Sequence, residues 1–408
     1  MSETRPERLS LNSKLLLFMV ASFSIGSGAY MVLLNLYLKE IGFGEAFIGQ
    51  ILGLVSVGLI ITTIPLAWLC GRIRIKGILI GSVVLNAVGD VLLILGPEPW
   101  INQIGAVISG MGMSAWLVAT GPFIMRNATK SQRSKIFSWK SGLGMAGAAV
   151  ASISFGRWVD ALIAGGGDVM QSYQTVLVIA TASKITAAVL GLFLTPHDPL
   201  PEEKRDFKDF VSARDWGHLF RLTFPTFLIG LGAGLTMPFM NLYFRNRFSM
   251  GPGEIGGLFF ACQMFMALGT VLGPKFAERR GNIVTILLTQ VTSLPFMLIL
   301  AFTGNLYLAI AAFFIRSTLM NMGHPLFHHF AMEIVELREQ AVTNASIGLA
   351  WNAAWFISSW LGGLSIEKYG FTPTIVATTA FYGVASMLQF HFFRKKTFLE
   401  IGRFSQAA

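Results

Sequence analysis

Charged residues are scarce in this sequence: Asp, Glu, Lys and Arg together make up 13% of its 408 residues, whereas 53% are hydrophobic. Soluble domains usually carry about a quarter charged residues. A chain with so little charge cannot form the polar surface of a water-soluble protein, and lipid is the solvent that fits it. The net charge of +10 does not indicate nucleic acid as a partner, because the basic residues form short clusters between apolar runs and no single basic face.

Cysteines are few, and nucleotide-binding motifs are missing. The two cysteines, Cys70 and Cys262, lie in different apolar stretches without a CxxC pair, which argues against a disulfide framework and a zinc site. We interpret both as packing residues. The sequence contains no Gly-x-x-x-x-Gly-Lys-Ser/Thr loop, so ATP is not the energy source. We expect neither a metal nor a cofactor.

Long apolar runs make up most of the chain. A membrane helix needs about 20 mostly apolar residues to cross a hydrocarbon core about 30 Å thick. Twelve runs reach this length: 15–38, 47–69, 78–96, 103–125, 136–159, 173–194, 220–244, 255–276, 283–303, 306–332, 342–366 and 373–393. The first run is too long for the apolar region of a signal peptide, so we expect it to be a membrane span. The sequence therefore predicts an all-α membrane protein with twelve transmembrane helices.

The distribution of Lys and Arg predicts the orientation of these spans. With the N-terminus inside, most of the 31 basic residues fall in the inner loops and tails. The outer loops hold only Lys39, Arg157, Arg245, Arg247 and Lys368. Because basic loops stay on the cytoplasmic side, we expect both termini in the cytoplasm and the protein in the cytoplasmic (inner) membrane.

One long connection divides the chain nearly in half. Residues 195–219 are charge-dense and contain proline, whereas most other connections are short. We expect this stretch to be a cytoplasmic linker between an N-terminal six-helix bundle, residues 1–194, and a C-terminal six-helix bundle, residues 220–408.

The two halves also repeat a sparse set of residues in one register. Asn35-Leu36-Tyr37 recurs as Asn241-Leu242-Tyr243. After one added residue in the following loop, Ile108 recurs as Ile315. A parallel repeat of six spans relates the halves by an axis along the membrane normal, with a site between them.

Six spans, a charged linker and six more spans, with cytoplasmic ends, resemble the major facilitator superfamily over nearly the whole chain. In that family a Gly-x-x-x-Asp-Arg-x-Gly-Arg loop between the second and third helices of each half helps to latch the halves. The second half retains Glu278, Arg279 and Gly281 of this loop, whereas the first half keeps Arg72 and has no acid. The resemblance implies that these four residues form a gating loop. Alternatively, they only mark loops on the positive inner side.

The resemblance also implies a secondary transporter that moves a small-molecule substrate by alternating access, and we expect a monomer. Drug–proton antiporters of the family tend to carry a Gly-Pro-x-x-Gly-Gly run in the fifth helix and an arginine in the fourth. This chain has neither. The resemblance therefore covers the superfamily and does not extend to the antiporter subclass.

Arg316 lies deep in the tenth span, where an ionisable group is costly and needs a reason. It follows about ten residues after the start of the span, which at about 1.5 Å per residue is near the bilayer midplane. The tenth helix lines the central cavity in the family, and a guanidinium there suits an anionic group of a substrate. The alternative is a salt bridge within the C-terminal half.

A polar stripe continues along the same helix. Asn321, His324 and His328 lie within about 60° of one another at 100° per residue, and Glu333 follows them. Histidine titrates near neutral pH, so we regard His328 and Glu333 as candidates for proton coupling. Asn321 and His324 are candidates for substrate binding. The alternative is that the histidines only form hydrogen bonds between helices.

Asp90 in the third span and Lys184 in the sixth are the other deep charges. Their depths allow one structural salt bridge that satisfies both, which is the interpretation we favour. The rival interpretation makes Asp90 the proton carrier.

Polar and aromatic residues on other helices complete the candidate substrate site. Ser27 and Asn35 lie on the first helix and Asn241 on the seventh. The eleventh span adds Trp351, Asn352 and Trp355. Aromatic side chains with polar partners suit a cavity for a flat or amphiphilic organic molecule, although packing against lipid explains the tryptophans equally well.

The leading functional hypothesis is export of a small organic molecule driven by proton exchange, and the alternative is a carrier of organic anions or metabolites. An enzyme fits less well. His324-x-x-x-His328-His329 resembles one histidine box of the membrane di-iron desaturases, which use three such boxes. A channel or sensor does not explain the repeated halves. We expect a transporter that contacts lipid, protons and a small-molecule substrate.

Overall fold

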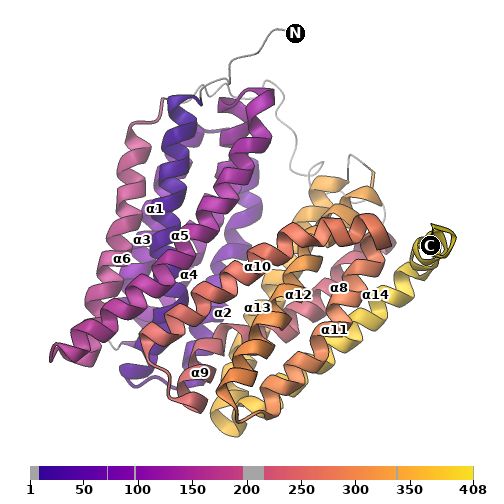
Figure 1. Cartoon of the computed structure of the whole chain (residues 1–408). Helices are drawn as coiled ribbons and strands as arrows, with labels where there is room; N and C mark the ends of the chain where they lie inside the picture. Colours follow the sequence, from indigo (N-terminus) through magenta and orange to yellow (C-terminus); the bar gives the residue numbers. More distant parts are fainter. Residues whose placement is uncertain (1–8, 71, 96–97, 196–215, 337–338, 408) are drawn as a thin grey trace, which may run out of the picture. The chain divides into compact units, whose positions relative to one another are not determined.

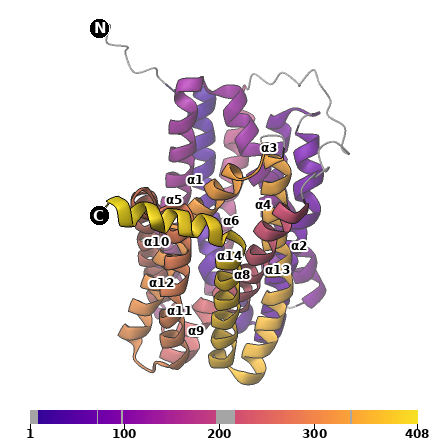
Figure 2. The ribbon, with the colours of Figure 1, turned by 90° about the vertical axis from the view of Figure 1, so that its right-hand side faces the viewer.

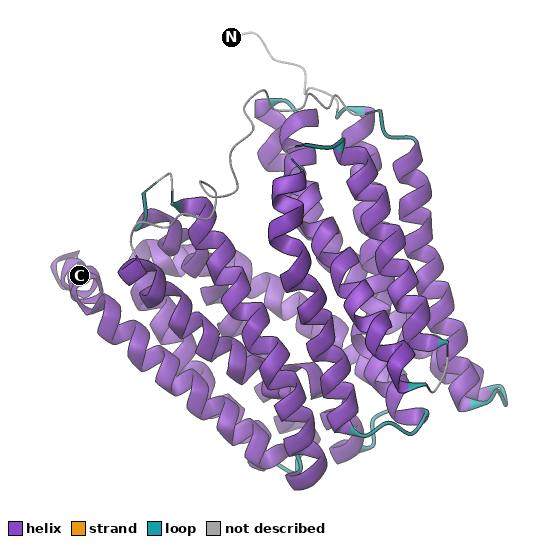
Figure 3. Ribbon diagram, turned by 180° about the vertical axis from the view of Figure 1, so that it is seen from behind, coloured by secondary structure: helices purple, strands orange, loops and turns teal. Residues whose placement is uncertain are grey.

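A computed structural model of the chain describes residues 9–70, 72–95, 98–195, 216–336 and 339–407. Within these residues the chain is built of helices joined by short loops, as Figure 3 shows. The predicted linker at 195–219 lies mostly outside the described residues. The helical part divides into two compact units, Met1–Leu34 with Gly58–Lys204 and Asn35–Val57 with Arg205–Ala408.

The first unit is built mainly from the six helices that begin the chain (Figure 1). They are α1 (Leu11–Glu40), α2 (Glu45–Leu69), α3 (Ile75–Ile94), α4 (Pro99–Asn127), α5 (Lys130–Ala164) and α6 (Val169–Leu192). An apolar core with Leu16, Phe23, Leu79, Trp116 and Phe123 joins α1, α3 and α4. Small residues let these helices approach closely. The missing side chain of Gly89 on α3, for example, leaves room for the backbone of Ser109 on α4.

The second unit contains the remaining helices together with the end of α1 and the start of α2. In chain order they are α8 (Trp216–Thr236), η1 (Met237–Phe239), α9 (Met240–Phe248), α10 (Pro252–Arg280), α11 (Asn282–Phe302), α12 (Leu306–Glu333), α13 (Gln340–Tyr369) and α14 (Phe371–Ala407). Its main apolar core includes Leu222, Ile283, Ile286, Phe330 and Phe393.

The twelve predicted spans each coincide with a helix, if α8, η1 and α9 are counted together as the seventh. Eleven of these helices are long and apolar enough to cross a bilayer. The exception is α13, which is 30 residues long, about 45 Å at 1.5 Å per residue, but carries polar and tryptophan residues along its length. A helix of that composition is long enough to span the membrane but is too polar to face lipid on all sides.

Two helices depart from the continuous spans that the sequence predicts. The seventh span breaks at Met237–Phe239, where Pro238 has no N–H to continue the helical ladder and a short 3₁₀ turn replaces it. The last helix, α14, continues well beyond the predicted end at residue 393 after a kink at Phe393 (φ −110°, ψ 16°). Figure 2 shows the segment after the kink running at a steep angle to the rest of α14.

Candidate substrate site

Arg316 is buried inside the second unit and has no acidic partner. Its side chain on α12 is 6% exposed. One terminal nitrogen donates to the hydroxyl of Tyr382 on α14 at 2.7 Å, and the other lies 2.5 Å from the sulfur of Met237. Its Nε atom is buried without a hydrogen-bond partner. The internal salt bridge that the sequence left open is therefore not formed among the described residues, and the guanidinium retains an unused donor.

The position of Arg316 next to Met237 places it at the break between α8 and α9. Discontinuous membrane helices are typical of transporter binding sites, because the break leaves backbone groups to face a ligand. Thr236, which precedes the break, bonds its hydroxyl to that of Thr378 at 2.6 Å. The second unit thus brings together a helix break and an unneutralised cation.

The polar stripe of α12 forms in part. The rings of His324 and His328 lie 4.8 Å apart between their centroids, tilted by 56°. Asn321, in contrast, bonds its amide nitrogen back to the carbonyl of Ser317 at 2.9 Å. Glu333 at the end of the helix lies 3.4 Å from Lys396 and is half exposed. The structure therefore pairs the two histidines but gives Glu333 a separate ion-pair partner.

The tryptophans of α13 face α8. The indole rings of Trp351 and Trp355 lie 6.0 Å apart. The glycines of α8 make room for them: a Cβ on Gly234 would lie 3.2 Å from the Cα of Trp355. The indole nitrogen of Trp355 is buried without a hydrogen-bond partner, as are side-chain atoms of Thr285, Ser359 and Gln389 in the same unit. Asn352 bonds its side chain to the carbonyl of Gly348 on its own helix at 2.9 Å.

Asp90 and Lys184 form the predicted salt bridge in the first unit, where each side chain is 3% exposed. Ser109 donates to the other carboxylate oxygen of Asp90 at 2.8 Å, and Lys184 also donates to Asn86 at 2.8 Å. The prediction of this ion pair is confirmed. Because both charges are neutralised inside a hydrogen-bonded network, this arrangement supports the structural interpretation over that of a free proton carrier. Ser27, also in this unit, only bonds to the carbonyl of Phe23 at 3.0 Å.

Asn35 and Asn241, which the repeat relates to each other, meet in the second unit. The amide nitrogen of Asn35 donates to the side-chain oxygen of Asn241 at 3.1 Å and to the carbonyl of Pro238 at 2.6 Å. Both asparagines are almost fully buried. This contact lies beside the helix break, because Asn35 bonds to Pro238, which is part of the 3₁₀ turn.

Two ion pairs lie where α1 ends and α2 begins. Glu40 pairs with Arg245 of α9, and Lys39 pairs with Glu45 at 2.8 Å. Sequence reasoning missed this cluster, because residues on three separate helices form it. The alternation of acid and base around Glu40 and Glu45 was the only available signal.

The residues of the predicted gating loop lie apart from any ion pair. Arg72 stacks its guanidinium over Trp68, 3.8 Å from the ring centroid. Glu278 and Arg279 are exposed and make no hydrogen bond or ion pair with the part of the chain that is described. Gly281 adopts φ +87°, which a residue with a side chain rarely does. The latch therefore stays a prediction.

A carboxylate that the sequence did not single out lies over Gly281. Glu400, after the kink of α14, accepts a hydrogen bond from the backbone N–H of Val284 at 3.1 Å. Its carboxylate occupies the space that a side chain at Gly281 would fill. Burial raises the pKa of Glu400, an effect that the Val284 hydrogen bond opposes. Glu400 thus caps the first turn of α11 through the Val284 N–H, but burial outweighs this hydrogen bond, so folding favours the protonated form of Glu400.

The sequence matches the profile of the Major Facilitator Superfamily over residues 16–359, with a second match over 222–400. The chain belongs to the major facilitator superfamily. It is therefore a multi-pass membrane protein and a transporter, not an enzyme, and it works as a secondary transporter by alternating access. This assignment excludes the alternative of a membrane enzyme with a histidine box.

Two relatives match this sequence at low identity. The Bacillus subtilis (strain 168) protein "Uncharacterized MFS-type transporter YfnC" is 27% identical over 152 residues. That alignment covers 37% of this chain and 36% of the relative, so the chain matches only about a third of its length. The Saccharomyces cerevisiae (strain ATCC 204508 / S288c) protein "Uncharacterized membrane protein YJR124C" is 24% identical over 327 residues, 69% of this chain and 71% of that protein.

Solved structures of the superfamily share the fold. A bacterial homologue of the human lysosomal transporter Spinster, inward-facing and occupied, superposes with a TM-score of 0.78 at 14% identity, covering 95% of this chain and 97% of that one. The nucleoside transporter NupG gives a TM-score of 0.71 at 15% identity, covering 94% and 99%. The outward-facing transporter FucP gives 0.62 at 16% identity, covering 93% and 98%. At these identities the likeness shows the fold alone.

Proposed function

We propose that this major facilitator carries a small organic anion across the cytoplasmic membrane, with Arg316 binding the anionic group. The observation that supports this most is the buried guanidinium without an acid. An arginine in the middle of a membrane helix costs about 2.5–3.5 kcal/mol on insertion scales. A carboxylate or phosphate held by Arg316 would recover part of that cost through charge-assisted hydrogen bonds.

The groups around Arg316 set further limits on the ligand. The groups that its terminal nitrogens contact are the phenol of Tyr382 and the thioether of Met237. These groups can accept or donate weakly but carry no negative charge that would compete with an anion. The unused donors of Arg316 and Trp355 are consistent with an anion rather than a cation as substrate.

Transport into proteoliposomes tests the proposal. A thermal-shift screen of carboxylates and phosphate esters first selects anions that stabilise the purified protein. Uptake of the selected anion is then compared between the native protein, Arg316→Ala and Arg157→Ala. Arg157 is exposed on α5, so its variant removes the same charge without touching the site. Loss of uptake in Arg316→Ala alone supports the proposal, and equal uptake in all three proteins contradicts it.

Proton-driven export is a second candidate, and the paired rings of His324 and His328 favour it. Two imidazoles 4.8 Å apart repel each other when both are charged, so such a pair can hold one proton at a time. An imposed pH gradient in the same proteoliposomes tests this idea. If the anion moves equally with and without the gradient, proton exchange is not the driving force.

A further inference from the structure

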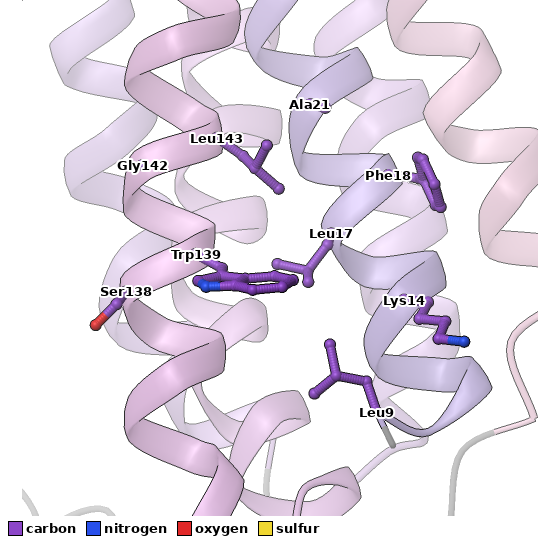
Figure 4. A pocket seen from close by; sticks show the side chains of 9 residues that line it. All are labelled: Leu9, Lys14, Leu17, Phe18, Ala21, Ser138, Trp139, Gly142 and Leu143. Carbon is purple, nitrogen blue, oxygen red and sulfur yellow. The ribbon is translucent and has the colours of Figure 1, made fainter. Parts of the chain in front are cut away.

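A cavity of about 900 Å³ lies between α1 and α5, entirely within the first unit and on a different unit from Arg316. Figure 4 shows the side chains of Trp139 and Leu143 on α5 pointing toward α1, where Leu17 faces them. The remaining lining residues are Leu9, Lys14, Phe18, Ala21, Ser138 and Gly142. The volume is in the range of small-molecule pockets, about 300–1,000 Å³.

The lining of this cavity has one cation and no anion. Lys14 carries the only charge, and it has no acidic partner in the part of the chain that the structure describes. All of the other lining residues except Ser138 are aliphatic or aromatic, or are glycine or alanine. Phe18 is 64% exposed and Trp139 is 47% exposed, although both are large and apolar. These two side chains and the leucines form the apolar wall of the cavity, and Lys14 is the one charged residue of its lining.

The charge lies at one end of the cavity. Lys14 is in the first turn of α1, whereas Ala21 lies two turns deeper, about 10 Å along the helix. Lys135 on α5 adds a second cation at the same end, with its amine 5.1 Å from the ring centroid of Trp139. A cationic end followed by an apolar floor matches a molecule with an acidic head and one apolar chain. Small residues, Ala21 and Gly142, leave room for that chain.

We propose that the cavity between α1 and α5 binds a single-chain amphiphilic anion, a long-chain carboxylate, with its head at Lys14 and its chain against Leu17, Trp139 and Leu143. The proposal is independent of the function assigned to Arg316. A two-chain anionic phospholipid has the same head charge, but we commit to the single-chain acid because the lining belongs to one gap between two helices.

Fluorescence quenching of Trp139 tests the proposal. The probe is a long-chain carboxylic acid that carries a nitroxide on its chain, added to the purified full-length protein. The quenching that disappears in Trp139→Phe reports on this cavity alone. The uncharged alcohol of the same chain length and with the same nitroxide separates the contribution of the head from that of the chain.

We expect Lys14→Ala to weaken binding of the acid about tenfold or more, since a charge-assisted hydrogen bond is lost. Lys14→Arg should retain it, binding of the alcohol should not change, and Lys275→Ala, an exposed lysine of the second unit, should behave as the native protein. Arg316→Met should also leave quenching unchanged, so this proposal and the proposed function can fail separately.

Two results would overturn the proposal. One is an absence of Trp139-dependent quenching in the native protein. The other is displacement of the probe by an anionic two-chain phospholipid but not by an unlabelled long-chain acid, which would make the cavity a site for bilayer lipid.

Discussion

Replacing Arg316 by Met should make the protein more stable and at the same time unable to bind its anion. Removing the buried cation recovers about 2.5–3.5 kcal/mol on insertion scales. The change leaves the hydroxyl of Tyr382 without its 2.7 Å partner, which costs about 1–3 kcal/mol. Adding Tyr382→Phe removes that orphaned group, so the double variant should exceed the native protein by about 2.5–3.5 kcal/mol.

Thermal unfolding in detergent, with and without anion, measures both effects. An anion at 100 times its dissociation constant should stabilise the native protein by about 2.7 kcal/mol and the double variant not at all. The single variant Tyr382→Phe serves as the control, because it keeps the cation and should still respond to the anion. A double variant that is less stable than the native protein without ligand would show that Arg316 is a structural group. The reasoning about an uncompensated charge would then be wrong.

Three further variants test the ion pairs and the C-terminal cap. Lys184→Met leaves Asp90 buried and unpaired, so it should lower stability by about 3–5 kcal/mol in thermal unfolding, and added Asp90→Asn should recover most of that loss. Arg245→Glu should cost at most about 1 kcal/mol at this partly exposed pair, and the swap with Glu40→Arg should restore it in a double-mutant cycle. The pKa of Glu400 is raised on folding. Glu400 should therefore stabilise the segment after Phe393 at low pH, and this stabilisation should be lost as the pH rises through the raised pKa. The protection of this segment against hydrogen exchange, corrected for the intrinsic pH dependence of amide exchange, should fall with rising pH in the native protein and not in Glu400→Gln.

The helices and the repeat could be predicted because one strong constraint governs them. Backbone groups in lipid must bond within the helix, so each span appears as a long apolar run. The deep ion pair of Asp90 and Lys184 was predictable for the same reason, since two charges at matching depths are too costly to leave apart. The contact between Asn35 and Asn241 follows from the repeat, although the sequence analysis assigned both residues to substrate binding.

Features that depend on a contact between one residue and a distant segment of the chain could not be predicted. Pro238 marked a possible break in the seventh helix, but proline is tolerated in several other membrane helices of this chain, such as α11 at Pro295. The cap of Glu400 on α11 joins residues more than a hundred positions apart. Only the folded chain shows that the glycine of the loop motif is needed at Gly281 for a positive φ and for the approach of that carboxylate.

The predicted repeat allows Ser109 and Arg316 to be compared. It aligns Ile108 with Ile315, so the next residues, Ser109 and Arg316, also correspond. In the first unit Ser109 completes a network in which every charge is neutralised, since it donates to Asp90 at 2.8 Å. In the second unit the same position holds a cation with no acid to neutralise it. Under the proposed function, this difference between the two halves is the means by which the second half binds an anion. The variant Arg316→Ser gives this position the residue of the first half. If that variant still transports the anion, the difference between the halves at this position has no role in recognition of the anion.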